Sequence, residues 1–265
     1  ERASRRQRGR GVEEEDMATA LCCCFSGEPL NQDEAQGRRG GMYAKYLGNR
    51  EKFQLSMGDA CCKEPGCCLL GGCPICFCCT THHMRYKVLN HVSPNSGWDH
   101  YICCQGYTGP CCCFTPGACC EKELPRTCMC CEIICCPGLA VSTNRFVMMD
   151  HYQFTPDECD NRLIRFNNCI QILSCICHIL AIFNRDFQQL AAIIDLIADI
   201  VFFSTAGCMT AQVNYEVKYR ESLAAPVAVA GGPVVSPAVP PTATVVGVVQ
   251  PPPPGAPPVG EDMSR

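Results

Sequence analysis

The stretch that decides the fold is CIQILSCICHILAIF at residues 169–183, followed by the polar turn NRD at 184–186 and by FQQLAAIIDLIADIVFFSTA at 187–206. In both apolar segments large residues recur at intervals of three and four, which is typical of one face of an α-helix. The sequence therefore predicts a helical hairpin. Its apolar faces comprise Ile172, Leu173, Ile176, Ile179, Leu180 and Phe183 in the first helix, and Leu190, Ile193, Ile194, Ile197 and Val201 in the second.

Membrane insertion of this hairpin meets two objections. A transmembrane helix needs about 20 predominantly apolar residues, and the first segment is shorter and contains His178. The second contains Asp195 and Asp199, which are costly in a bilayer unless they face protein or water. We expect these carboxylates to form a polar face or to pair with Arg165 or His178. The favoured arrangement has apolar faces that pack on each other or lie in the membrane interface; a water-soluble hairpin and a two-pass insertion remain alternatives.

The caps on either side of the hairpin complete its predicted bounds. Asp157, Asp160 and Asn161 are residue types that cap helix N-termini, and they precede the first helix. Gly207 follows the second apolar segment, and glycine commonly ends a helix. The sequence predicts that the second helix runs from about residue 187 to residue 206.

An internal repeat precedes the hairpin. RYKVLNH at residues 85–91 matches RFVMMDH at residues 145–151, and each copy follows a cysteine cluster closed by a proline, Pro74 or Pro137. Proline suits the first turn of a helix, where its missing N–H would be unpaired in any case. We predict two units, each a Cys-rich loop followed by a helix, with the helices at about 74–91 and 137–152.

These features divide the 265 residues into four regions and predict a mostly α fold. A disordered, polar leader occupies residues 1–60, the duplicated Cys-rich region 61–152, the hairpin 153–220, and a disordered tail rich in Pro, Val and Ala 221–265. The proline run at 251–254 in the tail could dock a protein partner. The net charge of −4 carries no basic excess for binding nucleic acid.

Cysteine is the compositional anomaly, with 28 residues in the chain. No secretory signal follows Met17, the first candidate start, which predicts a reducing compartment where structural disulfides are rare. We therefore expect free thiols, and a disulfide-stapled secreted domain is the alternative. Cys22, Cys23 and Cys24 precede Phe25, and cysteines of this kind are typical S-acylation sites. They predict a lipid-anchored protein at the cytosolic face of a membrane.

Metal binding is a second use for the thiols. Structural zinc is often held by two Cys-x-x-Cys pairs, and that spacing occurs at Cys73/Cys76 and at Cys128/Cys131. Thiolates would also bind softer ions such as copper(I) or cadmium. We expect either zinc or no cofactor.

Enzymatic motifs are missing from the sequence. There is no phosphate-binding glycine loop, Gly-x-Ser-x-Gly or His-Glu-x-x-His, and nothing singles out one cysteine as a nucleophile. We predict a non-enzymatic protein whose partner is the lipid surface.

One segment resembles a known family. CCLLGGCPIC at residues 67–76 is similar to the signature of the placenta-specific-eight family, which includes plant cadmium-resistance and fruit-weight regulators: two cysteines, four variable residues, then Cys-Pro-Cys. Ile75 is inserted before the last cysteine. The resemblance, over about residues 61–90, implies a small Cys-rich, membrane-associated protein. It assigns the motif positions to Cys67, Cys68, Cys73, Pro74 and Cys76.

Overall fold

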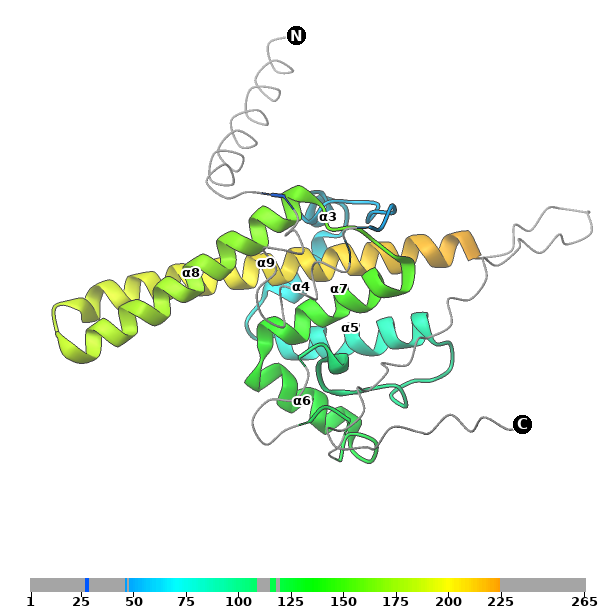
Figure 1. Cartoon of the computed structure of the whole chain (residues 1–265), viewed down its shortest axis with the longest axis horizontal. Helices are drawn as coiled ribbons and strands as arrows, with labels where there is room; N and C mark the ends of the chain where they lie inside the picture. Colours follow the sequence, from blue (N-terminus) through cyan, green and yellow to red (C-terminus); the bar gives the residue numbers. More distant parts are fainter. Residues whose placement is uncertain (1–26, 29–45, 47, 109–114, 118–119, 225–265) are drawn as a thin grey trace, which may run out of the picture. The chain divides into compact units, whose positions relative to one another are not determined.

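The chain is described by a computed structural model in which residues 27–28, 46, 48–108, 115–117 and 120–224 can be placed (Figure 1). These residues form seven α-helices, one 3₁₀ helix and no strand, so the predicted mostly helical class is confirmed. An isolated bridge joins Glu51 to Phe154. In chain order, the elements are α3 (Met57–Lys63), α4 (Pro65–Gly72), α5 (Phe77–Val92), η1 (Cys103–Gly106), α6 (Pro125–Cys135), α7 (Pro137–Tyr152), α8 (Glu158–Phe183) and α9 (Phe187–Ala224).

The duplicated units fold as two equivalent helices. Helices α5 and α7 each have 16 residues and lie against each other. The second begins at Pro137 as predicted, but the first begins at Phe77 rather than Pro74, because a turn closed by the Cys76 N–H and the Cys73 carbonyl precedes it.

Both copies of the repeat bury their arginine. The Arg85 guanidinium donates to the Glu132 carboxylate at 2.9 Å, to the Asn144 side chain at 2.5 Å and to the carbonyl of Ala140 at 2.9 Å. Glu132 also accepts from the Tyr101 hydroxyl at 2.9 Å. Buried charges are tolerated when they are paired and hydrogen-bonded, so this network joins α5, α6 and α7.

The second arginine makes an equivalent network around α8. Arg145 pairs with the Asp160 carboxylate at 2.5 Å, and both side chains are almost fully buried. Asp160 also accepts from the Met57 N–H at 2.8 Å and from the Gln212 amide at 2.8 Å. One carboxylate therefore ties together α3, α7, α8 and α9. Asp157, rather than Asp160, is the N-cap of α8 and accepts from the Cys159 N–H.

Helix α9 does not end at Gly207, which corrects the sequence prediction. The helix continues to Ala224, and its second half packs on α3, α4, α5 and α7. A Cβ at Gly207 would fall on the carbonyl oxygen of Cys68 and lie 3.1 Å from the Gly72 nitrogen. Glycine is therefore required for the close approach of α4 to α9 and not for termination. The second half of α9 therefore shares a core with the Cys-rich region, across the boundary predicted between residues 152 and 153.

We expect Gly207→Ala to destabilise the protein by about 1–3 kcal/mol, because the new methyl group must push two helix backbones apart. The check is thermal unfolding in detergent micelles followed by circular dichroism. Gly66→Ala in α4 is the matched control: a Cβ there meets nothing within 4 Å, so the protein should keep or gain stability. Equal melting temperatures for wild type and Gly207→Ala would contradict the close-contact role.

The first copy of the repeat also buries the side chain of its histidine, from which we expect the stability of the protein to depend on pH. The His91 side chain is 8% exposed, its ring nitrogen lies 2.7 Å from the Tyr152 hydroxyl, and burial lowers its pKa despite the nearby Glu221 carboxylate. The positive charges of Lys87 and Arg220 also lower this pKa. The unfolded chain therefore takes up the proton first as the pH falls below about 6.5. The neutral ring's contribution is present above that pH and is lost below it.

We expect His91→Gln to reduce the loss of stability between about pH 7.5 and pH 5.5, because glutamine has no proton to gain. Melting temperatures of wild type and variant across this range give the measurement. His100→Gln serves as the control because His100 is exposed. If His91→Gln lost as much stability as the wild type on acidification, the pH dependence would have to come from other groups.

Candidate functional site: an inverted helical hairpin and its sulfur groups

The hairpin formed by α8 and the first half of α9 has small residues at its helix–helix contact. Ser174 and Cys177 of α8 are buried, as are Ala191 and Ala198 of α9. Small side chains let two helix backbones approach closely, and they are enriched where helices associate inside membranes. This stripe could have been recognised in the sequence from its spacing of three and seven residues.

Polar side chains also bridge the two helices at the edge of this contact, where His178 and Asp195 stay about half exposed. The Ser174 hydroxyl donates to Asp195 at 2.9 Å, and a His178 ring nitrogen lies 3.2 Å from the same carboxylate. The Gln171 amide donates to the carbonyl of Ala198 at 2.8 Å. The predicted pairing of Asp195 with His178 is therefore present, whereas Asp199 is exposed and Arg165 donates to the carbonyl of Glu28 instead. These contacts satisfy polar groups within the hairpin, which is the arrangement that a bilayer requires.

The large apolar residues point outward from the hairpin, not toward the partner helix. Ile182 and Phe183 are 80% and 82% exposed. Of the two arrangements expected, packing of the apolar faces on each other is therefore wrong, because small residues fill that contact, and contact of these faces with a membrane is the one that agrees with the structure. The other exposed apolar side chains of the hairpin are Ile172, Leu173, Ile176, Ile179, Leu180, Leu190, Ile193, Leu196, Ile197 and Ile200.

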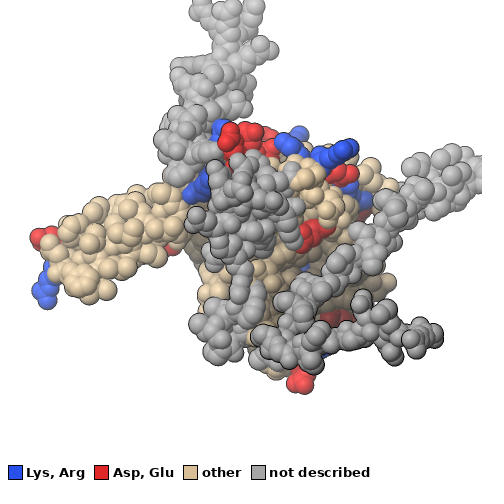
Figure 2. Space-filling view, viewed as in Figure 1, with Lys and Arg blue, Asp and Glu red and all other residues tan. Residues whose placement is uncertain are grey.

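The hairpin is long enough and apolar enough to reach across a membrane. Helices α8 and α9 have 26 and 38 residues, and each contains a segment that meets the length and hydropathy expected of a transmembrane helix. At 1.5 Å per residue, the part of α8 that follows Arg165, residues 166–183, is about 27 Å long, close to the thickness of a hydrocarbon core of about 30 Å. Figure 2 shows the hairpin surface uncharged along most of its length, with charge at the tip, where Arg185 and Asp186 are exposed.

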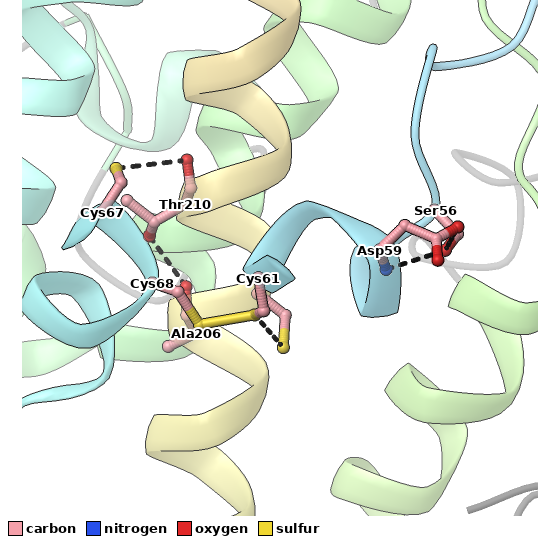
Figure 3. Close-up of a disulfide and its surroundings, with 8 residues drawn as sticks. Ser56, Asp59, Cys61, Cys67, Cys68, Ala206 and Thr210 are labelled. Carbon is pink, nitrogen blue, oxygen red and sulfur yellow. Dashed lines mark hydrogen bonds between the residues drawn. A yellow bond between two sulfur atoms is a disulfide. The ribbon is translucent and has the colours of Figure 1, made fainter. Parts of the chain in front are cut away.

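Three sulfur atoms converge where α3 and α4 meet α9. A disulfide joins Cys61 to Cys68, and the Cys208 sulfur lies 3.0 Å from that of Cys61 (Figure 3). The nearby Cys67 thiol faces the carbonyl of Thr210 at 3.8 Å. The disulfide differs from the expected fully reduced state, but it links two cysteines only seven residues apart, on the successive helices α3 and α4. No local pattern in the sequence indicates this group, because Cys208 lies 147 residues from Cys61.

A second group, Cys103, Cys104 and Glu132, has its ligand atoms within 4.8 Å of one another. Glu132 is already engaged by Arg85, by Tyr101 and by the Cys104 N–H at 2.8 Å. A cation there would face the buried guanidinium and compete with three hydrogen bonds, so the residues fit a structural role rather than a metal site.

The two predicted Cys-x-x-Cys pairs are not brought together into one site. No three of the sulfurs of Cys73, Cys76, Cys128 and Cys131 lie within 4.8 Å of one another. Cys73 and Cys76 flank the turn between α4 and α5, whereas the other two lie on α6.

Some of the other predicted site residues lie in the described part of the chain and others do not. Cys67 and Cys68 of the family motif lie on α4, and Pro74 lies in the turn that follows. Cys22, Cys23, Cys24 and the tail proline run at 251–254 lie outside the described residues. Comparison with models of protein families, with curated proteins and with solved structures finds no match to this chain.

Proposed function

We propose that this chain is a non-enzymatic, Cys-rich membrane protein held by insertion of the α8–α9 hairpin into a bilayer. The observation that carries the proposal is the inverted hairpin, with large apolar side chains outside, small ones buried between the helices and the polar groups of Ser174, His178 and Asp195 paired across them. In water, such an exposed apolar surface marks an interaction site. In lipid the same surface is solvated, and the internal hydrogen bonds around Asp195 have no competitor.

The hairpin also defines a topology. Because two antiparallel helices enter and leave by the same side, the helices before α8 and the second half of α9 remain together in one compartment. We place them in the cytosol, since the N-terminal thiols of Cys22, Cys23 and Cys24 can then receive acyl chains as a second anchor. One acyl chain anchors only marginally, whereas two signals anchor stably. The resemblance to a membrane-associated family agrees with this location.

Alkaline carbonate extraction of membranes from cells that express the full chain tests the proposal. We expect the protein to stay in the pellet when Cys22, Cys23 and Cys24 are all replaced by Ser, because the hairpin holds it without acyl chains. Peripheral proteins that are washed off by carbonate serve as the control. Recovery of the wild-type protein in the supernatant would overturn the proposal.

The convergence of Cys61, Cys68 and Cys208 favours a second function, which is binding of a soft metal ion when the disulfide is reduced. Three thiolates within 4.8 Å match the ligands that zinc and copper(I) prefer. The oxidised pair cannot bind in the same way, so metal binding and the disulfide exclude each other.

We expect the reduced full chain, purified without oxygen, to bind about one zinc ion, and Cys208→Ser to weaken binding at least about tenfold, in the range seen when a metal site is damaged. Metal analysis after desalting, with a zinc-chelator competition, gives the measurement. Cys175→Ser, on an exposed hairpin position, is the matched control. Equal zinc affinity in wild type and Cys208→Ser would remove this second function.

A further inference from the structure

The place where the hairpin leaves the rest of the protein is marked by Phe202 and Phe203 of α9. Before them, Ile197 and Ile200 are exposed, and after them Ala206 and Met209 are buried. If the hairpin enters a bilayer, this level of α9 lies next to the membrane surface.

Three separate segments meet at that level. The Phe77 ring, at the start of α5, lies 5.7 Å from the ring of Phe202 and 5.6 Å from that of Phe203. A Cβ at Gly72, the end of α4, would lie 3.0 Å from the Phe203 carbonyl oxygen, and one at Gly138, at the start of α7, would lie 3.7 Å from the Phe202 ring. The ends of α4, α5 and α7 therefore surround the base of the hairpin.

Cysteines flank each of these contact points. Cys78 and Cys79 follow Phe77, and Cys135 precedes Pro137 and Gly138; all three cysteines are exposed. Cys73, directly after Gly72, is half-buried. We call Cys73, Cys78, Cys79 and Cys135 the collar cysteines.

The collar is also apolar and uncharged. Ile75 is 90% exposed and Ile134 is 74% exposed, each within three residues of a collar cysteine. No Asp, Glu, Lys or Arg occurs from residue 65 to residue 84, and from 127 to 144 the sole charged residue is Glu132, which is buried and paired with Arg85. Exposed apolar side chains without charged neighbours are suited to contact with a lipid surface rather than with water.

From this arrangement we infer that the collar cysteines are S-acylation sites whose fatty chains enter the leaflet into which the hairpin inserts. This inference rests on the proposed membrane insertion. The acyl donor is a long-chain fatty acyl-coenzyme A. The thiolate sulfur attacks the acyl carbonyl carbon, a new thioester C–S bond forms, and the coenzyme A thiolate leaves and takes up the proton lost by the cysteine. No electrons are transferred.

Cys73 is the collar thiol best prepared for this reaction. Hydrogen bonds from the backbone of Cys76 and of Ile75 lower its pKa, and a larger thiolate fraction favours attack on an acyl group. The duplicated units contribute to the same collar, Cys78 and Cys79 from the first and Cys135 from the second. Acyl chains on both would fix the orientation of the protein on the membrane as well as its attachment, because one chain alone anchors weakly.

The test uses the full chain with Cys22, Cys23 and Cys24 replaced by Ser, expressed in eukaryotic cells fed an alkynyl fatty acid. We expect about two or more hydroxylamine-labile acyl groups per chain by intact mass, a number at which anchoring becomes stable. Adding Cys73→Ser, Cys78→Ser, Cys79→Ser and Cys135→Ser should reduce the label at least about fivefold. The matched control adds Cys62→Ser and Cys159→Ser instead. These cysteines adjoin residues that contact the second half of α9, beyond Phe203: Cys61 contacts Cys208, and Asp160 binds Gln212. Both controls are exposed and lie beyond the collar.

The inference would be overturned if the collar variant kept the label of the parent chain. It would also be overturned if the collar thiols were blocked by disulfides, which a reductant releases. Carbonate extraction of the same samples separates this outcome from failure of the proposed function. A wild-type chain that stays in the membrane pellet but carries no acyl groups refutes only the collar acylation. A chain in the supernatant refutes the membrane hairpin. Limited trypsin digestion establishes that the collar variant keeps its fold.

Discussion

Replacing Ile176 and Ile193 together by Arg is expected to move the protein from the membrane pellet to the soluble fraction. Both side chains are exposed near the middle of the hairpin, and they lie close to the level of the contact between Ser174 and Asp195. An arginine at the centre of a membrane helix costs about 2.5–3.5 kcal/mol. Two of them cost about 5 kcal/mol or more, a factor of about 5,000 in the partition equilibrium. Carbonate extraction followed by immunoblotting measures the change.

Leu223→Arg is the control for this pair. Leu223 is also an exposed apolar residue of α9, but it lies at the opposite end of the helix from the hairpin, so the variant should remain in the pellet. A second control replaces both residues by leucine, which changes the same two sites but keeps them apolar, so this variant should also remain in the pellet. A double-arginine variant that remained embedded would show that this surface does not contact lipid.

Loss of the Asp160 carboxylate is expected to cause the largest change in stability. Asp160→Ala leaves the Arg145 guanidinium buried without its charge partner and removes an acceptor from the Met57 N–H and from Gln212. Breaking a buried ion pair by removing one partner costs about 3–5 kcal/mol. For a chain of this size, that lowers the melting temperature by about 10 °C. Thermal unfolding in detergent micelles gives the measurement.

Two variants separate the buried charge from other effects. Glu158→Ala removes an exposed carboxylate that lies 3.9 Å from Arg162, and such surface pairs contribute about 1 kcal/mol or less. Arg145→Met in the Asp160→Ala background removes the unpaired guanidinium and should restore part of the lost stability. The two residues would be energetically independent if Arg145→Met lowered the free energy of unfolding by the same amount in the Asp160→Ala background as in the wild type.

The internal repeat was recognisable in the sequence because its signal is local. Helix α5 buries one side, whereas α7 is buried on all sides from Thr143 to Met149, but both keep the same order of arginine, apolar residues and histidine. Their existence and the start of α7 at Pro137 were predicted correctly. The acidic partners of the two arginines, Glu132 and Asp160, lie 47 and 15 residues away, and no spacing rule connects them to the repeat.

The hairpin was predicted in position but not in orientation. A periodic apolar face indicates a helix that hides that face from water, but the same period arises whether the face meets protein or lipid. The choice is made by the opposite face, where Ser174 and Ala198 allow the helices to approach and leave Ile176 and Ile193 outside.

By itself, the sequence determined the helical class, the duplicated units, the turn between the long helices and the excess of sulfur, because each depends on residues close together along the chain. Tertiary structure alone decided that Gly207 lies within a helix, that Cys208 meets Cys61, and that the ends of α4, α5 and α7 surround Phe202. These outcomes depend on which surfaces of distant helices can approach most closely. That approach is set by the shape of glycine, alanine and serine side chains rather than by any periodic pattern.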